Sequence, residues 1–117
     1  MITDLNYLQQ MTGNDSEMIK SMIELFLHQL AEMRGDFELL LKQKDWSELS
    51  RLAHKIKSSS LVMGIEQLTN DMKELELLAK EGKNIEKYPD YIDRFKTTAD
   101  LVEVELTMFL DSHENKN

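Results

Sequence analysis

Apolar residues recur at spacings of three and four along most of the chain, which is the period of an amphipathic α-helix. The longest of these patterns covers roughly 30 residues, or about 45 Å of helix at a rise of 1.5 Å per residue. It predicts one long helix with a continuous core-facing stripe. The residues of that stripe are Ile19, Met22, Ile23, Phe26, Leu30, Met33, Phe37, Leu40 and Leu41.

Capping residues predict where the first two helices begin and end. Thr3 is expected to cap a short helix over residues 4–11, which ends before Gly13 because glycine adopts the left-handed closing conformation easily. Asn14, followed three residues later by Glu17, has the pattern of a capping box. We therefore expect Asn14 to begin the long second helix.

A third helix is predicted between a second capping box and a glycine. Asp45 and Glu48 repeat the capping pattern, and Gly64 is expected to close the helix. The predicted inner face consists of Trp46, Leu49, Leu52, Ala53, Ile56, Ser60 and Met63.

Two more helices follow. The fourth is expected over residues 65–80, before Gly82, and the single proline, Pro89, lies near the start of the last, where its missing N–H is tolerated. The tail, residues 112–117, is polar and is expected to fray. The inward residues are Leu68, Met72, Leu75 and Leu78 in the fourth helix, and Ile92, Phe95, Ala99, Val102, Leu106 and Phe109 in the last.

These elements predict an all-α fold, an up-down antiparallel four-helix bundle with a short additional N-terminal helix, because short loops between long helices make neighbours antiparallel. The low counts of glycine (4) and proline (1) favour long helices with few connections. A length of 117 residues fits one domain over 1–117, ordered over about 4–110.

Composition narrows the classes of function. A net charge of −8 argues against DNA or RNA as a partner. With no cysteine, the chain has no disulfide, thiol chemistry or thiolate metal site. We find no secretion signal and no apolar run of the roughly 20 residues that a membrane span needs, so we expect a cytoplasmic protein without membrane contact. The starting Met1 and the polar tail favour a free-standing protein.

One segment departs from the acidic surface. Residues 51–60 contain three permanent cations, one histidine and no carboxylate. On a helical projection His54 lies roughly 140° from the centre of the inner face, so it points outward. Lys57 is its neighbour at i+3, and Ser58 shares its face at i+4. A neutral imidazole is a nitrogen nucleophile, and an ammonium group next to it can hold phosphoryl oxygens.

The neighbours of this histidine suit the approach of a partner. The side chains of Ser58 and Ser59 are small, and their hydroxyls can donate to a phosphoryl group. Arg51 and Lys55 add positive charge, and Leu61 lies off the core stripe and can belong to a docking patch. By contrast, His28 and His113 lack basic and small neighbours, so we assign both to the surface.

The run from Ala53 to Gly64 resembles the signature of histidine-containing phosphotransfer (HPt) domains. In that family a small residue precedes the phosphorylated histidine, an aliphatic residue and a lysine follow at two and three positions, and a glycine stands ten positions later. His54, Lys57 and Gly64 meet these positions. Ser58 departs from the family pattern, where glycine is most frequent.

The resemblance implies a step in a phosphorelay. Nε2 of His54 would accept a phosphoryl group from the aspartate of a receiver domain and pass it to another receiver, with Lys57 contacting the phosphoryl oxygens. The implied partners are receiver domains of hybrid sensor kinases and response regulators, and the Mg²⁺ is expected on the receiver. The chain itself would need no cofactor, metal or ATP, would not be an enzyme, and would act as a monomer.

Three alternatives remain open. The phosphoacceptor bundle of a sensor kinase usually has an acidic residue directly after the histidine, where this chain has Lys55. A chemistry-free docking module of the same fold would not need both His54 and Lys57. A structural bundle that binds another helix would expose a large apolar stripe, whereas only scattered residues such as Tyr7 and Leu61 are expected outside the core.

Overall fold

The computed structural model describes residues 2–114, and side chains as far as residue 112. Within these residues the chain is helical and has no strand, which confirms the all-α prediction. The elements are α1 (Asn6–Met11), α2 (Ser16–Gln43), α3 (Trp46–Val62), α4 (Glu66–Glu81), the short 3₁₀ helix η1 (Ile85–Lys87) and α5 (Tyr88–Glu114).

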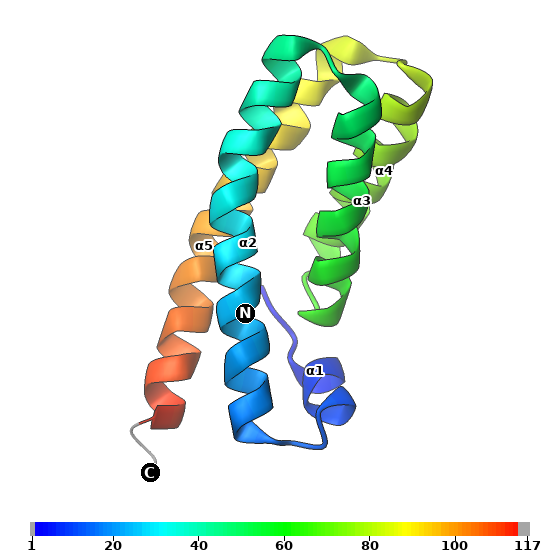
Figure 1. The fold of residues 1–117 in the computed structure, drawn as a ribbon. Coiled ribbons are helices and arrows are strands. Elements are labelled where there is room, and N and C mark those ends of the chain that lie inside the picture. Colours follow the sequence, from blue (N-terminus) through cyan, green and yellow to red (C-terminus); the bar gives the residue numbers. More distant parts are fainter. Residues whose placement is uncertain (1, 115–117) are drawn as a thin grey trace.

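The two longest helices, α2 and α5, run side by side along a molecule of 49 × 22 × 20 Å (Figure 1). Next to them, α3 and α4 form a hairpin, and successive long helices are joined at alternate ends. Ion pairs from Arg34 to Asp100 and from Lys96 to Glu38 link α2 to α5. The short helix α1 lies at the end of the bundle where α3 finishes.

The core consists largely of the residues that the apolar pattern predicts. Phe37 of α2 and Phe95 of α5 are fully buried and meet edge to face, with ring centroids 5.0 Å apart. Several predicted inward residues are only half-buried because they lie at the borders of the stripes. They are Met22, Leu40, Leu41, Trp46, Leu52, Leu78 and Phe109.

Of the N-caps predicted for α2 and α3, the first is wrong and the second is confirmed. The N-cap of α2 is Asp15, not Asn14, and its carboxylate accepts hydrogen bonds from the backbone N–H groups of Glu17 and Met18. Asn14 instead adopts a left-handed conformation with φ 61°, which turns the chain between the two helices. At α3 the predicted cap holds, since the Asp45 carboxylate accepts from the N–H of Glu48 at 3.2 Å.

The N-terminal segment differs from the prediction because it is tied to the opposite end of the chain. Helix α1 begins at Asn6, and its N-cap is Leu5 rather than Thr3. The Thr3 hydroxyl instead donates to the Glu105 carboxylate of α5 at 3.1 Å, and the N–H of Ile2 donates to the same carboxylate at 3.0 Å. This long-range partner removes Thr3 from the capping position.

At the other end, the first residues of the tail that is predicted to fray belong to the last helix. Helix α5 continues through Glu114, and residues 115–117 lie outside the described part of the chain. Across residues 2–114, no helix combines the length and the apolar character needed to span a bilayer.

Candidate functional site

His54 lies on the outer face of α3, as predicted. Its side chain is 58% exposed, whereas Ala53 and Ile56 on the inner face are fully buried. The amphipathic pattern of α3 therefore places the imidazole where another protein can reach it.

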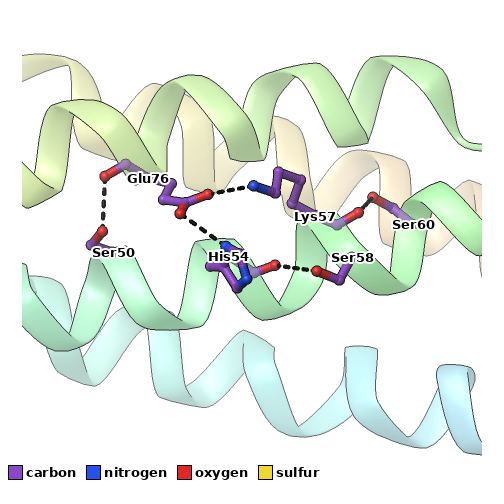
Figure 2. A network of polar contacts seen from close by, with 6 residues as sticks. All are labelled: Ser50, His54, Lys57, Ser58, Ser60 and Glu76. Atoms are coloured by element: carbon purple, nitrogen blue, oxygen red, sulfur yellow. Dashed lines mark hydrogen bonds and ion pairs between the residues drawn. The ribbon is translucent and has the colours of Figure 1, made fainter.

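A carboxylate that lies 22 positions further along the chain holds the imidazole (Figure 2). Glu76 of α4 has one oxygen 2.9 Å from Nδ1 of His54, and its other oxygen accepts a hydrogen bond from Nζ of Lys57, also at 2.9 Å. The surroundings of His54 are thus not purely basic, contrary to the expectation from residues 51–60. Glu76 links the histidine and the lysine in one network.

This contact fixes the tautomer of the neutral ring. A carboxylate at neutral pH only accepts hydrogen bonds, so Nδ1 of His54 carries the hydrogen and donates it. Nε2 then keeps its lone pair. Burial acts to raise the pKa of Glu76, but its hydrogen bonds to Lys57 and His54, together with their charges, outweigh burial and hold the pKa below its usual value.

Two serines of α3 form further hydrogen bonds to α4 on either side of this network. The Ser50 hydroxyl donates to the backbone carbonyl of Glu76 at 2.8 Å, and the fully buried Ser60 lies 2.8 Å from the Thr69 hydroxyl of α4. Their small side chains allow α3 and α4 to approach closely. No buried side-chain nitrogen or oxygen in the described residues lacks a hydrogen-bond partner.

The imidazole borders an open cavity of about 510 Å³ between α3 and α4. The cavity carries hydroxyl and cationic groups, which suit an anionic group, and also the Glu76 carboxylate, whose two oxygens are engaged with His54 and Lys57. Its lining residues are Ser47, Ser50, Arg51, His54, Lys55, Glu76 and Lys80.

The other predicted site residues divide between two sides of α3. Ser58 and Leu61 lie on the exposed side with His54; Ser58 bonds back to the His54 carbonyl at 3.2 Å, and Leu61 is 64% exposed. Arg51 is also exposed and pairs with Glu48 at 2.9 Å. Ser59 instead lines a groove between α2 and α3, and Lys55 borders both this groove and the cavity at His54.

Gly64 supports the fold and not the surface around the imidazole. Its φ is +66°, and a Cβ atom there would lie 2.1 Å from the backbone oxygen of Asp4. The glycine therefore allows the N-terminal segment to cross the end of α3, where the N–H of Asp4 donates to the Met63 carbonyl at 3.2 Å.

Sequence reasoning missed Glu76, Ser50 and Lys80. The helical period of α4 does place Glu76 and Lys80 on one side, at i and i+4, but it does not say which neighbouring helix that side meets. A contact between a histidine and a carboxylate on the same helix does not by itself indicate a site, since His28 contacts Glu32 at 3.0 Å on an open surface. The described residues contain no group of three or more side chains placed to hold a metal ion.

Comparison with known proteins places this site in a family. The model of the Hpt domain matches residues 21–114, which include all of α3, α4 and α5. No curated protein and no solved structure matched the chain. The matched region contains His54, Lys57 and Glu76 and covers well over half of the sequence, so this chain belongs to the Hpt domain family.

Proposed function

We propose that the chain is a phosphoryl carrier in a phosphorelay, in which His54 accepts a phosphoryl group from one receiver domain and delivers it to another. Membership of the Hpt family supports histidine phosphotransfer as the reaction class. The observation that supports the choice of residue is the exposed imidazole whose Nδ1 is bonded to Glu76.

In the proposed step, the lone pair of Nε2 attacks the phosphorus of a receiver's aspartyl phosphate. The N–P bond forms as the P–O bond to the aspartate breaks, and the aspartate leaves as a carboxylate. The ring then carries positive charge, which the Glu76 carboxylate stabilises through Nδ1–H, as a buried carboxylate stabilises an imidazolium elsewhere. The reverse transfer to a second receiver uses the same geometry.

Lys57 remains our proposed contact for the phosphoryl oxygens. In the structure its ammonium group holds Glu76, so it reaches a phosphoryl group only by leaving or sharing that carboxylate. The exposed residues on the His54 side of α3, Arg51, Ser58 and Leu61, are proposed to face the receiver.

Several wider features belong to the same proposal. Receiver domains of hybrid kinases and response regulators are the partners, and the receiver brings the Mg²⁺. The chain has no cofactor or ATP-dependent activity of its own and works in the cytoplasm as one domain. Its four long helices form an up-down antiparallel bundle, an arrangement supported by their connections at alternate ends (Figure 1).

The test is phosphate transfer from purified receivers. Mg²⁺-loaded, phosphorylated receivers would be mixed with the wild type, with His54→Gln and with His28→Gln, and label would be followed by intact mass. We expect label on the wild type and on His28→Gln, none on His54→Gln, and loss of the label in acid but not in base, as a phosphoramidate requires. His28 is a matched control because it too is an exposed histidine beside a carboxylate.

Two results would contradict the proposal. Label that persists on His54→Gln would place the phosphate on another residue, and label that resists acid would place it on a serine such as Ser58 or Ser59. A folded wild type that takes no label from any receiver would favour a docking module without chemistry.

A further inference from the structure

We propose that Lys80 of α4 binds the phosphoryl group carried by His54, and that it does so as the available cation of the cavity between α3 and α4. This inference rests on the proposed function and names a residue that the signature around His54 does not contain.

The positive charge of Lys57 is already paired with a carboxylate. Lys57 is 27% exposed on its side chain, and its ammonium lies 2.9 Å from a Glu76 oxygen. Much of its charge is therefore compensated by the carboxylate that also holds the imidazole. A phosphoryl group that recruited Lys57 would compete with Glu76 for it.

Lys80 borders the same cavity as the imidazole. It follows Glu76 by four residues, so both side chains occupy the same side of α4. Lys80 and His54 both line the cavity of about 510 Å³, which Lys57 does not line. Lys80 is exposed, and none of the ion pairs between described side chains includes it. Its flexible four-carbon stem can turn toward a group on His54.

The other two cations of the cavity are less suited to this role. Arg51 forms an ion pair with Glu48 at 2.9 Å. Lys55 follows His54 directly, so its side chain projects about 100° away around α3. It also lines the groove on the side of α2. Lys80 is therefore the cation on the Glu76 side of the imidazole that is not engaged with a carboxylate.

A cation at this position would stabilise the phosphoryl group during and after its transfer. Charge is spread over the three non-bridging oxygens of the transferred group, and a positioned ammonium stabilises it in the transition state and in the product. A nearby cation also favours the more highly charged form of the phosphoryl group, which lowers its pKa. This second effect does not depend on how a receiver docks.

The experiment compares Lys80→Gln with Lys87→Gln. Both variants remove one exposed lysine and change the net charge equally, but Lys87 belongs to η1 and does not line the cavity. Two quantities would be measured: the transfer rate at saturating phosphorylated receiver, and the pKa of the phosphoryl group on His54 by ³¹P NMR. Circular dichroism would confirm that both variants are folded.

We expect Lys80→Gln to slow the saturated rate by about 3- to 10-fold, a modest factor because the cavity is open to water. We also expect it to raise the phosphoryl pKa, while Lys87→Gln matches the wild type in both. If Lys80→Gln keeps both the rate and the pKa, or if the two variants behave alike, the inference about Lys80 is wrong although the carrier function stands. If the wild type accepts no phosphate, the proposed function fails, and this inference fails with it.

Discussion

Three side chains of α3, those of Ser50, His54 and Lys57, contact a single residue of α4. The backbone oxygen of Glu76 accepts a hydrogen bond from Ser50, and its two carboxylate oxygens bond to His54 and Lys57 (Figure 2). The carboxylate thereby orients the imidazole and the ammonium together. The exposure of His54 and its closeness to Lys57 follow from the helical period. The contact with Glu76 does not follow from this period, because the rotation of α4 relative to α3 depends on packing between the two helices, which no local sequence pattern predicts.

At this scale we predict that Glu76→Gln weakens phosphotransfer. A hydrogen bond to a charged group is worth about 1 kcal/mol more than a neutral one, which corresponds to roughly a 5-fold loss of rate. The ¹⁵N shifts of the His54 ring should also show a less uniform tautomer. Glu81→Gln is the control, since Glu81 lies on the same helix and pairs with Lys83 instead. An unchanged rate and unchanged ring shifts in Glu76→Gln would contradict a role for this carboxylate.

Stability should depend on the same carboxylate as the pH changes. Because the pKa of Glu76 is lowered in the folded protein, its ionised form is favoured by folding, so its contribution is present above the unfolded pKa near 4.5. That contribution disappears as the pH falls through the lower folded value. Urea unfolding should therefore show the wild type more stable than Glu76→Gln by roughly 0.5–1 kcal/mol at pH 7. The difference should shrink toward pH 3, and a constant difference would contradict this linkage.

At the scale of the elements, the N-terminal segment and the end of α3 depend on one another. Gly64 was expected to close α3, and its left-handed backbone confirms this expectation. The close approach of Asp4 was not predictable, because the anchor of the segment is Glu105 of α5, about a hundred residues away in sequence. For the same reason the predicted cap Thr3 was wrong, whereas Asp45, whose partner is local, was right.

This contact predicts different costs for two similar substitutions. Gly13 and Gly64 both have φ above +60°, but a Cβ at Gly13 meets no atom within 4 Å. Gly13→Ala should cost about 1–2 kcal/mol for the left-handed backbone alone. Gly64→Ala should cost at least about 3 kcal/mol, since overpacking against Asp4 adds to this. Equal losses of unfolding free energy in thermal or urea melts would show that Asp4 simply moves away.

At the scale of the whole molecule, the sequence predicts which residues are buried much better than it predicts which residues of different helices are in contact. Phe37, Phe95 and Leu106 could be assigned to the core from period alone, because burial depends on which side of a helix a residue occupies. The contact between α3 and α4 at Ser60 and Thr69, and the cavity at Lys80, required the helices to be placed side by side.

The apolar surface outside the core bears on how many copies of the chain associate. Leu101, Val104 and Met108 are exposed along the side of α5 that faces away from its buried residues. These three side chains cover only part of the roughly 800 Å² per partner that a stable interface needs, and other exposed apolar residues, such as Leu25 and Leu39 of α2 and Leu77 of α4, lie on other helices. We therefore predict a monomer of 13.7 kDa by size exclusion with light scattering over a range of concentrations. A stable dimer of twice that mass would contradict this and favour a sensor-kinase bundle. Leu101→Asp would then show whether α5 forms the interface, because a charge buried there would dissociate the dimer, whereas a dimer formed elsewhere would persist.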